Sequence, residues 1–260
     1  MVAREHFKTT GFVLRTLSYS ESDLIVSFYS HDFGKLKGIA KGAKRSKKRF
    51  ANVFEPFSMT DIIFTRKNRE TLAFIESCDI VDHYPSIRQD MEKTLIASYF
   101  IELTDHFSPE GKKNEKVFQL LQSFLLMLGR EKASDAVVRF FEIRLLKLAG
   151  FEPALNHCVI CRTPVVNGNS YYFHAGEGGI KCSACAKPQR YEQSISTGTL
   201  RTLLLGKDMD IDKIKLVTLT DSSAAESRCL LTGFISHVLG REVKSLKVME
   251  QVRKFCSCNP

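Results

Sequence analysis

The chain has 260 residues, of which 43% are hydrophobic, and a formal net charge of +9. This length allows two or three domains with cores of their own, and the hydrophobic content excludes a disordered chain. No apolar run approaches the roughly eighteen residues that span a membrane, and a basic protein prefers polyanions, either nucleic acid or an anionic membrane surface.

The first 84 residues are predicted to form a small β-domain. Strand patterns cover residues 10–17, 22–29, 34–40, 57–65 and 71–80, with turns at 18–21, 32–34 and 67–69. Five short strands, with no helix between the early ones, favour a closed sheet because closure removes exposed edges. An OB-type barrel is the most economical form of such a sheet.

A strongly basic loop leaves the third of these strands. It has eight positive charges in fifteen residues and no acidic residue: Lys35, Lys37, Lys41, Lys44, Arg45, Lys47, Lys48 and Arg49. Such a run is often only a solvated, mobile loop. The face and loops of OB barrels commonly carry nucleic acid, however, and long cationic side chains can follow phosphates without reading bases. We therefore predict that these eight residues bind nucleic acid.

Aromatic residues near the loop offer a second kind of contact. Phenylalanines and tyrosines that flank it can stack on unpaired bases. Phe50 and Phe54 follow the basic run directly, but a strand face needs such residues for its core first. We expect the phenylalanines to be core residues before they are stacking platforms.

Residues 85–150 are predicted to be the first part of a helical domain. Apolar residues recur at helical spacing in two stretches: Leu95, Ile96, Tyr99, Phe100, Leu103 and Phe107, then Val117, Phe118, Leu121, Phe124, Leu125 and Leu128. Ser134 can cap a third helix that runs through Leu148, with Gly150 placed to end it. By default, these apolar helix faces are interpreted as the core of a helical bundle. The more specific interpretation is a groove that binds a partner peptide.

Residues 151–192 are predicted to be a metal module. Cys158 and Cys161 form one C-x-x-C pair, and Cys182 and Cys185 form another after a gap of twenty residues. Each pair puts two thiolates on one tight turn, and four thiolates are the ligand set of a tetrahedral structural zinc ion with no open position. An iron–sulfur cluster fits the same ligands. His157 and His174 are expected to be bystanders, because four sulfurs already complete the coordination.

Two disulfides are the alternative, but they need an oxidising compartment. The chain begins without an apolar signal region, so we expect a cytoplasmic protein. A redox C-x-x-C would need only one pair, within a βαβ pattern that is absent. Cys78 and Cys229 are predicted to be core thiols, and Cys256 and Cys258 receive no role.

Residues 193–260 are predicted to complete the helical domain. One helix is expected over 195–205, and Ser223 and Glu226 form a capping-box pattern for another that ends near Gly240. The predicted fold is therefore α+β: an OB-type barrel (1–84), a helical domain in two parts (85–150 and 193–260) and an inserted zinc module (151–192).

Catalytic signatures are missing from the sequence. There is no phosphate-binding P-loop, no H-E-x-x-H and no G-x-S-x-G motif, so we expect no enzymatic activity. A zinc-ribbon RNA-binding or transcription factor is one alternative function. A nuclease is another, if acidic residues that are scattered in the sequence converge in three dimensions.

Several short segments, in order along nearly the whole chain, resemble the RecO family of recombination mediators. They are Glu21-Ser22-Asp23, Gly34-Lys35, the run from Ala40 to Phe50, Glu55-Pro56-Phe57, Arg139-Phe140-Phe141-Glu142, Gly150-Phe151-Glu152-Pro153, the four cysteines, and Leu239-Gly240-Arg241-Glu242-Val243-Lys244-Ser245. Each is modest alone, but their joint order is specific.

The resemblance implies an OB domain, a helical domain and a zinc module in a bacterial, nucleoid-associated protein. It implies binding to single- and double-stranded DNA, strand annealing, partnership with RecR and help in loading RecA. It also implies binding to the acidic C-terminal tail of single-stranded-DNA-binding protein. A tail with carboxylates beside an apolar end needs cations next to an apolar groove. The residues predicted to supply that groove are Phe118, Leu121, Arg139, Phe140, Arg144 and Leu145, with Arg139 singled out by the family motif.

Overall fold

The computed structural model describes residues 5–67, 71–186 and 193–258, the last four by their backbone alone. The chain divides into two compact units, the first made of Met1–Arg130 and Val248–Pro260 and the second of Glu131–Lys247. The division falls inside the segment 85–150 that was predicted as one helical part. Among the described helices, none combines the length and the apolar character needed to cross a bilayer.

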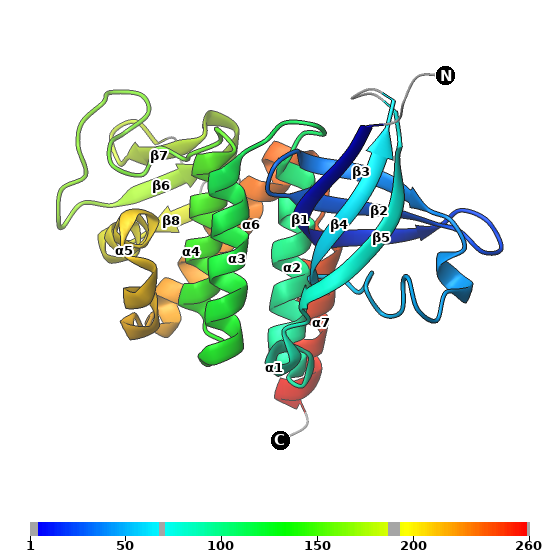
Figure 1. Ribbon diagram of the computed structural model, residues 1–260. Coiled ribbons are helices and arrows are strands. Elements are labelled where there is room, and N and C mark those ends of the chain that lie inside the picture. The colour runs from blue at the N-terminus through cyan, green and yellow to red at the C-terminus, as the bar shows by residue number, and fades with distance from the viewer. Residues whose placement is uncertain (1–4, 68–70, 187–192, 259–260) are drawn as a thin grey trace. The chain divides into compact units, whose positions relative to one another are not determined.

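The first unit begins with a five-stranded closed barrel (Figure 1). Its strands are β1 (Glu5–Ser18), β2 (Leu24–Ser30), β3 (Gly34–Ala40), β4 (Met59–Arg66) and β5 (Ala73–Asp82). Their order is β1-β2-β3-β5-β4, and β1 closes the barrel by pairing with β4. Among the described barrel strands, β3 and β5 pair in parallel, through Gly38 with Ala73 and Ile39 with Phe74. The predicted OB-type barrel is confirmed.

The alternation in the strands explains the barrel. Val26, Phe28, Ile62, Phe64 and Ile75 point inward and are essentially buried. Successive side chains on a strand point to opposite faces, so Ser27 and Ile63, which stand between these residues, lie on the outer face of the barrel. The two strands predicted last each begin two residues later than expected, at Met59 and Ala73. Of the turn predicted at 67–69, Asn68 and Arg69 lie outside the described residues.

Helices accompany the barrel in the first unit. They are α1 (Pro85–Arg88), α2 (Met91–Phe107), α3 (Glu115–Arg130) and the part of α7 (Lys244–Cys258) from Val248 onward. Asp90 caps α2 by accepting a hydrogen bond from the Lys93 N–H. Phe100 of α2 meets Phe124 of α3 edge-to-face at 6.0 Å. The predicted apolar stripes therefore form a core, as the default interpretation held.

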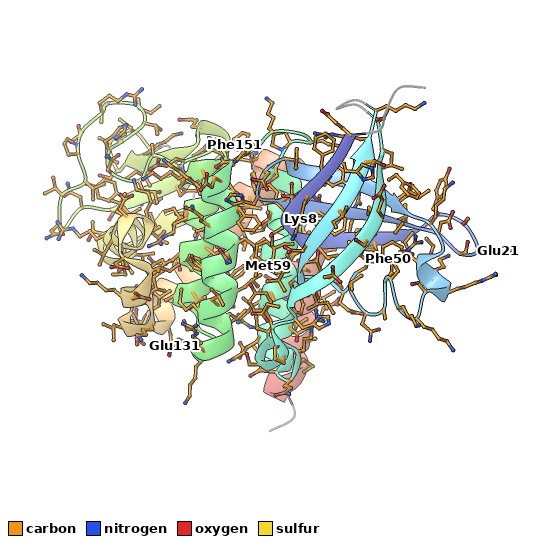
Figure 2. All side chains as sticks on the ribbon, in the orientation of Figure 1. Lys8, Glu21, Phe50, Met59, Glu131 and Phe151 are labelled. Atoms are coloured by element: carbon orange, nitrogen blue, oxygen red, sulfur yellow. The ribbon has the colours of Figure 1, made fainter. Side chains whose placement is uncertain are left out.

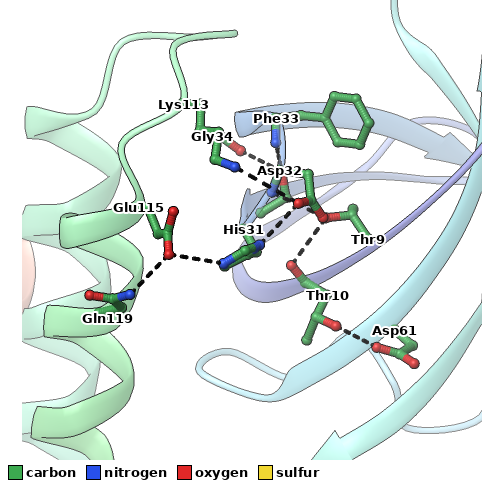
Figure 3. Close-up of polar contacts among 11 residues, drawn as sticks. Thr9, Thr10, His31, Asp32, Phe33, Gly34, Asp61, Lys113, Glu115 and Gln119 are labelled. Carbon is green, nitrogen blue, oxygen red and sulfur yellow. Dashed lines mark hydrogen bonds and ion pairs between the residues drawn. The ribbon is translucent and has the colours of Figure 1, made fainter.

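A polar network joins the barrel to α3 (Figure 3). His31, at the end of β2, has Nδ1 3.0 Å from Asp32 Oδ1 and Nε2 3.7 Å from Glu115 Oε1. Its ring also meets Phe118 of α3 edge-to-face at 5.2 Å. Thr9 of β1 donates to Asp32 at 2.8 Å. These contacts fix the β2–β3 turn against the helices of its own unit.

The second unit combines helices with a small sheet. The helices are α4 (Asp135–Leu148), α5 (Thr197–Asp208) and α6 (Asp221–Leu239), with a 3₁₀ segment, η3 (Ile211–Leu216), before α6. The strands β6 (Tyr171–His174), β7 (Gly179–Cys182) and β8 (Gln193–Ile195) form an antiparallel sheet in the order β7-β6-β8. The Ser134 cap of α4, its end at Leu148 and the left-handed Gly150 agree with the prediction.

Two local predictions in this unit were wrong. The cap of α6 is Thr220, whose hydroxyl accepts from the Ser223 N–H, so Ser223 lies inside the helix. Glu226 instead accepts from the Ser196 N–H at 2.9 Å, at the start of α5. A tertiary partner has replaced the local capping box. Cys229, predicted to be a core thiol, is exposed on α6, whereas Cys78 is buried as expected.

Candidate metal centre and nucleic-acid interface

The four cysteines of the predicted metal module come together in the second unit. Their sulfur atoms all lie within 4.8 Å of one another. A zinc ion with sulfurs at about 2.3 Å requires a tetrahedron with edges of roughly 3.8 Å. Cys161 Sγ and Cys182 Sγ are 3.7 Å apart, so the donor set and its spacing both fit a tetrahedral ion.

Backbone hydrogen bonds shape the two knuckles. The Cys158 N–H donates to Thr163 O, and the Arg162 N–H, with Arg162 in a left-handed conformation, donates back to Cys158 O at 3.0 Å. The Cys185 N–H donates to Cys182 O at 3.0 Å, just after the end of β7. Each pair of thiols is therefore held on a tight turn, as the spacing predicted.

The thiols are too close to ionise independently. The Thr163 hydroxyl and N–H lower the pKa of Cys161 to about 6. Contacts with Cys161 and Cys182 raise the pKa of Cys185 to about 12. Like charges crowded together oppose further ionisation, and a divalent cation removes that opposition. The cluster has the chemistry of a metal site.

Both nearby histidines make other contacts. The ring of His157 contacts Asn156 Oδ1 at 2.6 Å and Arg162 Nη1 at 3.0 Å. His174 Nδ1 accepts from the Glu177 N–H at 3.2 Å, at the start of the 3₁₀ turn η2 (Ala175–Glu177).

The basic loop leaves β3 of the barrel and contains a short 3₁₀ turn, η1 (Ala43–Arg45). Two of its predicted DNA contacts, Lys35 and Lys37, lie on β3 itself. Lys35 Nζ is 2.6 Å from Asp105 Oδ1 of α2 and its side chain is only 15% exposed. Lys37 Nζ is 2.6 Å from Glu110 Oε2. These two charges are neutralised within the first unit.

The other six basic residues are exposed: Lys41, Lys44, Arg45, Lys47, Lys48 and Arg49. Arg45 lies 3.7 Å from Glu21, but both side chains are well exposed, and such a pair contributes little. The guanidinium carbon of Arg49 lies 4.5 Å from the ring centre of Phe50, in a cation–π contact. Six cations thus face solvent in one short segment.

Buried apolar residues fix this segment to the barrel. Ala43, Phe50, Val53 and Phe54 belong to the same core cluster as the strands. Figure 2 shows Phe50 beside the barrel and Glu21 at the tip of the β1–β2 turn. The phenylalanines are therefore core residues, as expected, and the stacking role considered for Phe50 and Phe54 is wrong.

The β1–β2 turn holds the start of the basic loop. Asp23 Oδ1 accepts from the Gly42 N–H at 2.8 Å, and the Lys44 N–H donates to Ser22 O at 3.0 Å. Bonds from Gly42 and the Ser22 hydroxyl hold the pKa of Asp23 below its usual range. Gly42 has φ 69°, a conformation that favours glycine. The sequence motif Glu21-Ser22-Asp23 contained Asp23. Its contact with Gly42 could not be predicted, because the two residues are nineteen positions apart.

The other end of the loop is held from α1. Arg88 Nη2 donates to Pro56 O at 3.0 Å and to the Ser58 hydroxyl at 2.9 Å, and its guanidinium lies 4.4 Å from the ring centre of Phe57. Phe57 has φ 54°. A bulky residue with positive φ is uncommon, and its surroundings must hold it there. The backbone of the basic loop is thus anchored at both ends.

The predicted tail-binding residues do not form an exposed groove. Arg139 is 1% exposed, with Nη1 3.0 Å from Oε2 of Glu142, which is 0% exposed. Arg144 donates through Nε to Gly206 O at 2.9 Å, and burial lowers its pKa. The four predicted apolar members, Phe118, Leu121, Phe140 and Leu145, are buried as well. The cations and apolar side chains that were predicted to bind a partner instead make contacts within the folded chain.

A different hollow lies in the second unit, near the starts of α4 and α6. It has a volume of about 460 Å³. Its charged lining consists of two lysines and three carboxylate residues, and Lys215 Nζ lies 3.5 Å from Glu131 Oε1. The lining includes Glu131, Lys132, Asp135, Lys215 and Asp221, with the apolar Val137, Val217 and Leu219. Sequence periodicity could not reveal it, because its walls come from segments about eighty residues apart.

Comparisons with known proteins agree with this architecture. The family model described as "Recombination protein O N terminal" matches residues 3–84, and "Recombination protein O C terminal" matches residues 88–247. The chain belongs to the RecO family. Its RecO relatives include a "DNA repair protein RecO" of Syntrophus aciditrophicus, which is 47% identical over 98% of this chain and 99% of its own.

More distant RecO relatives also match almost end to end. The protein of the same name from Geobacter metallireducens is 33% identical, with 95% of this chain and 98% of its own covered. That of Desulfosudis oleivorans is 30% identical, with 96% and 99% covered. The resemblance read from short segments is confirmed over the whole chain.

Proposed function

We propose that this chain is a DNA-binding recombination mediator in DNA repair. It binds single- and double-stranded DNA, anneals complementary strands, and helps load RecA on gaps coated with single-stranded-DNA-binding protein. It works without a chemical step of its own, in the bacterial cytoplasm at the nucleoid. The observation that carries the proposal is the set of six exposed cations on an anchored loop of an OB-type barrel, in a member of the RecO family.

The DNA contact follows from the electrostatics of that loop. Phosphates are evenly charged along the chain of a nucleic acid, and Lys and Arg bind them without reading sequence. Anchoring the backbone lowers the conformational entropy lost on binding. A loop of this kind suits annealing, because both complementary strands present the same phosphates whatever their sequence.

Two protein partners complete the proposal. One is RecR. The other is the acidic C-terminal tail of single-stranded-DNA-binding protein, whose site lies outside the buried residues first predicted. The hollow in the second unit does not suit such a tail, because Glu131, Asp135 and Asp221 line it beside the two lysines and Lys215 already lies 3.5 Å from Glu131.

The test is annealing of complementary strands coated with the cognate single-stranded-DNA-binding protein. We expect faster annealing with this chain than without it, and loss of the gain when the coating protein lacks its acidic tail. Naked strands should also anneal faster with this chain than without it, since that acceleration needs no tail. No acceleration on naked or coated strands would contradict the proposal. Tighter binding to structured RNA than to single-stranded DNA at matched salt would favour an RNA-binding factor instead.

The proposed ion of the four-cysteine site is structural zinc. Cys158, Cys161, Cys182 and Cys185 would hold it, and four thiolates leave no position for a reacting water. When bound, the ion supplies charge compensation and cross-links the two knuckles. The chain's own contribution is the pair of tight turns that present the sulfurs at tetrahedral spacing.

Replacing Cys158 with serine should remove about one metal ion per chain, because three thiolates cannot close the tetrahedron. Metal analysis of the purified protein measures this directly. Hydrogen exchange should also become faster in β6 and β7, which flank the knuckles. Cys229→Ser is the matched control, since Cys229 is exposed on α6 outside the cluster. Iron in the wild-type protein, or full zinc content in Cys158→Ser, would refute structural zinc at this site.

A further inference from the structure

We propose that Tyr19, at the start of the β1–β2 turn, stacks on a base of bound single-stranded DNA and makes the interface prefer single strands to duplex. This inference rests on the proposed DNA-binding function and adds a base contact to the phosphate contacts of the basic loop. Tyr19 belongs to none of the sequence motifs that pointed to DNA.

The exposure of Tyr19 sets it apart. Its side chain is 63% exposed, whereas every other described phenylalanine and tyrosine except Phe151 is buried or only partly exposed. Residues of this type bury large areas when they can, because their hydrophobic surface is large. Within the described part of the first unit, Tyr19 is the one phenylalanine or tyrosine residue that is mostly exposed.

The position of Tyr19 places that ring at the basic loop. The Tyr19 N–H donates to Asp23 O at 3.2 Å and so helps to close the turn. Lys44 Nζ donates to the carbonyl oxygen of the next residue, Ser20. Asp23 in turn accepts from the Gly42 N–H. The turn and the start of the loop therefore form one rigid element that carries both the ring and the cations.

The pairing of a ring with cations is the chemistry that recognises single strands. Every base has a π-face on which an aromatic side chain can stack, and such stacking contributes without sequence preference. In a duplex these faces are covered by neighbouring base pairs, and exposing one costs unstacking energy. The loop cations contact phosphates of either form, so the ring is the part that distinguishes them.

The first experiment measures affinity for a single-stranded oligothymidine and for a duplex of the same length, at several salt concentrations. Tyr19→Ala should weaken single-strand binding about tenfold and change duplex binding by less than about twofold. The slope of log affinity against log salt should not change, because no phosphate contact is lost. Tyr19→Phe should bind as the wild type does, since stacking needs the ring and not the hydroxyl.

The second experiment detects stacking directly. The chain contains no tryptophan, so Tyr19→Trp introduces a single tryptophan, whose fluorescence can be excited selectively. Oligothymidine should quench its fluorescence at the concentrations that saturate binding. Phe151→Trp, at the other exposed aromatic position (46% exposed), is the control and should not be quenched.

The possible outcomes distinguish a failure of this inference from a failure of the proposed DNA-binding function. If the wild type binds DNA and Tyr19→Ala binds single strands equally well, the stacking role alone is overturned. The same holds if oligothymidine does not quench the fluorescence of Tyr19→Trp. An equal loss on single strands and duplex would overturn it too, because the turn would then act only by holding the loop. No DNA binding by the wild type would contradict the proposed function and this inference together.

Discussion

Replacing Arg139 with alanine should lower the free energy of unfolding of the second unit by about 3–5 kcal/mol. Arg139 and Glu142 are both essentially unexposed and lie 3.0 Å apart on α4. Removing the guanidinium takes a cation 3.0 Å away from the buried Glu142 carboxylate and weakens the compensation of its charge. An uncompensated buried charge is among the most costly single changes that a folded protein can undergo.

Hydrogen exchange of the α4 amide groups under native conditions measures this change without contribution from the first unit. Arg201→Ala is the matched control, since Arg201 is exposed on α5, and it should change stability by less than about 0.5 kcal/mol. The double variant Arg139→Met, Glu142→Leu should recover most of the loss, because well-packed apolar residues often replace a buried pair at little cost. If Arg139→Ala were as stable as the wild type, the pair would not hold α4.

The result bears on the family motif that contains Arg139. The sequence suggested that this arginine binds the acidic tail of a partner, in which case Arg139→Ala would weaken tail binding and leave the fold intact. In the structure its partner is Glu142, three residues along the same helix. A tail-binding defect in Arg139→Ala should therefore be accompanied by lower stability of the second unit, and the double variant Arg139→Met, Glu142→Leu should restore both tail binding and stability.

Replacing five cations of the basic loop with alanine should reduce affinity for single-stranded DNA roughly a thousandfold at 0.1 M salt. The five are Lys44, Arg45, Lys47, Lys48 and Arg49, all exposed. If they neutralise about five phosphates, log affinity of the wild type falls against log salt with a slope of about −3.5. Losing those contacts should flatten the slope in proportion, while the buried Phe50 and Phe54 keep the loop in place.

A variant with the same change of net charge controls for non-specific electrostatics. It replaces five exposed cations of the second unit with alanine: Arg201, Lys213, Lys215, Arg241 and Lys247. We expect its slope to stay near the wild-type value. A loop variant that is folded, by hydrogen exchange of the barrel strands, yet keeps the wild-type slope would place the main DNA contact elsewhere.

Lys35 and Lys37 are expected to behave differently from those five. Each has a carboxylate 2.6 Å away on the same unit. A lysine already paired releases fewer counterions on binding DNA, because its charge is partly neutralised beforehand. The basic run in the sequence has eight cations, and the structure leaves six of them for a polyanion.

The sequence by itself determined the parts of this protein that depend on neighbours along the chain. The alternation of side chains along short segments defines the barrel strands, since side chains on a strand repeat every two residues. Two C-x-x-C pairs define the metal knuckles, because each turn brings its own two sulfurs together. Ser134 caps α4 through a bond to a residue three positions on, Val137. In each case the deciding contact lies within one turn of the backbone.

Only the tertiary structure decided which of these residues face solvent and which partners they take. Arg139 is buried against Glu142, Lys35 reaches Asp105, and Glu226 reaches Ser196. Two of these three contacts join residues thirty or more positions apart, which no local pattern encodes. Burial depends on how elements pack, and a charged residue has the same appearance in a sequence whether packing leaves it in water or against an opposite charge. Tyr19 is the converse case, because packing left exposed a ring that composition alone would assign to the core.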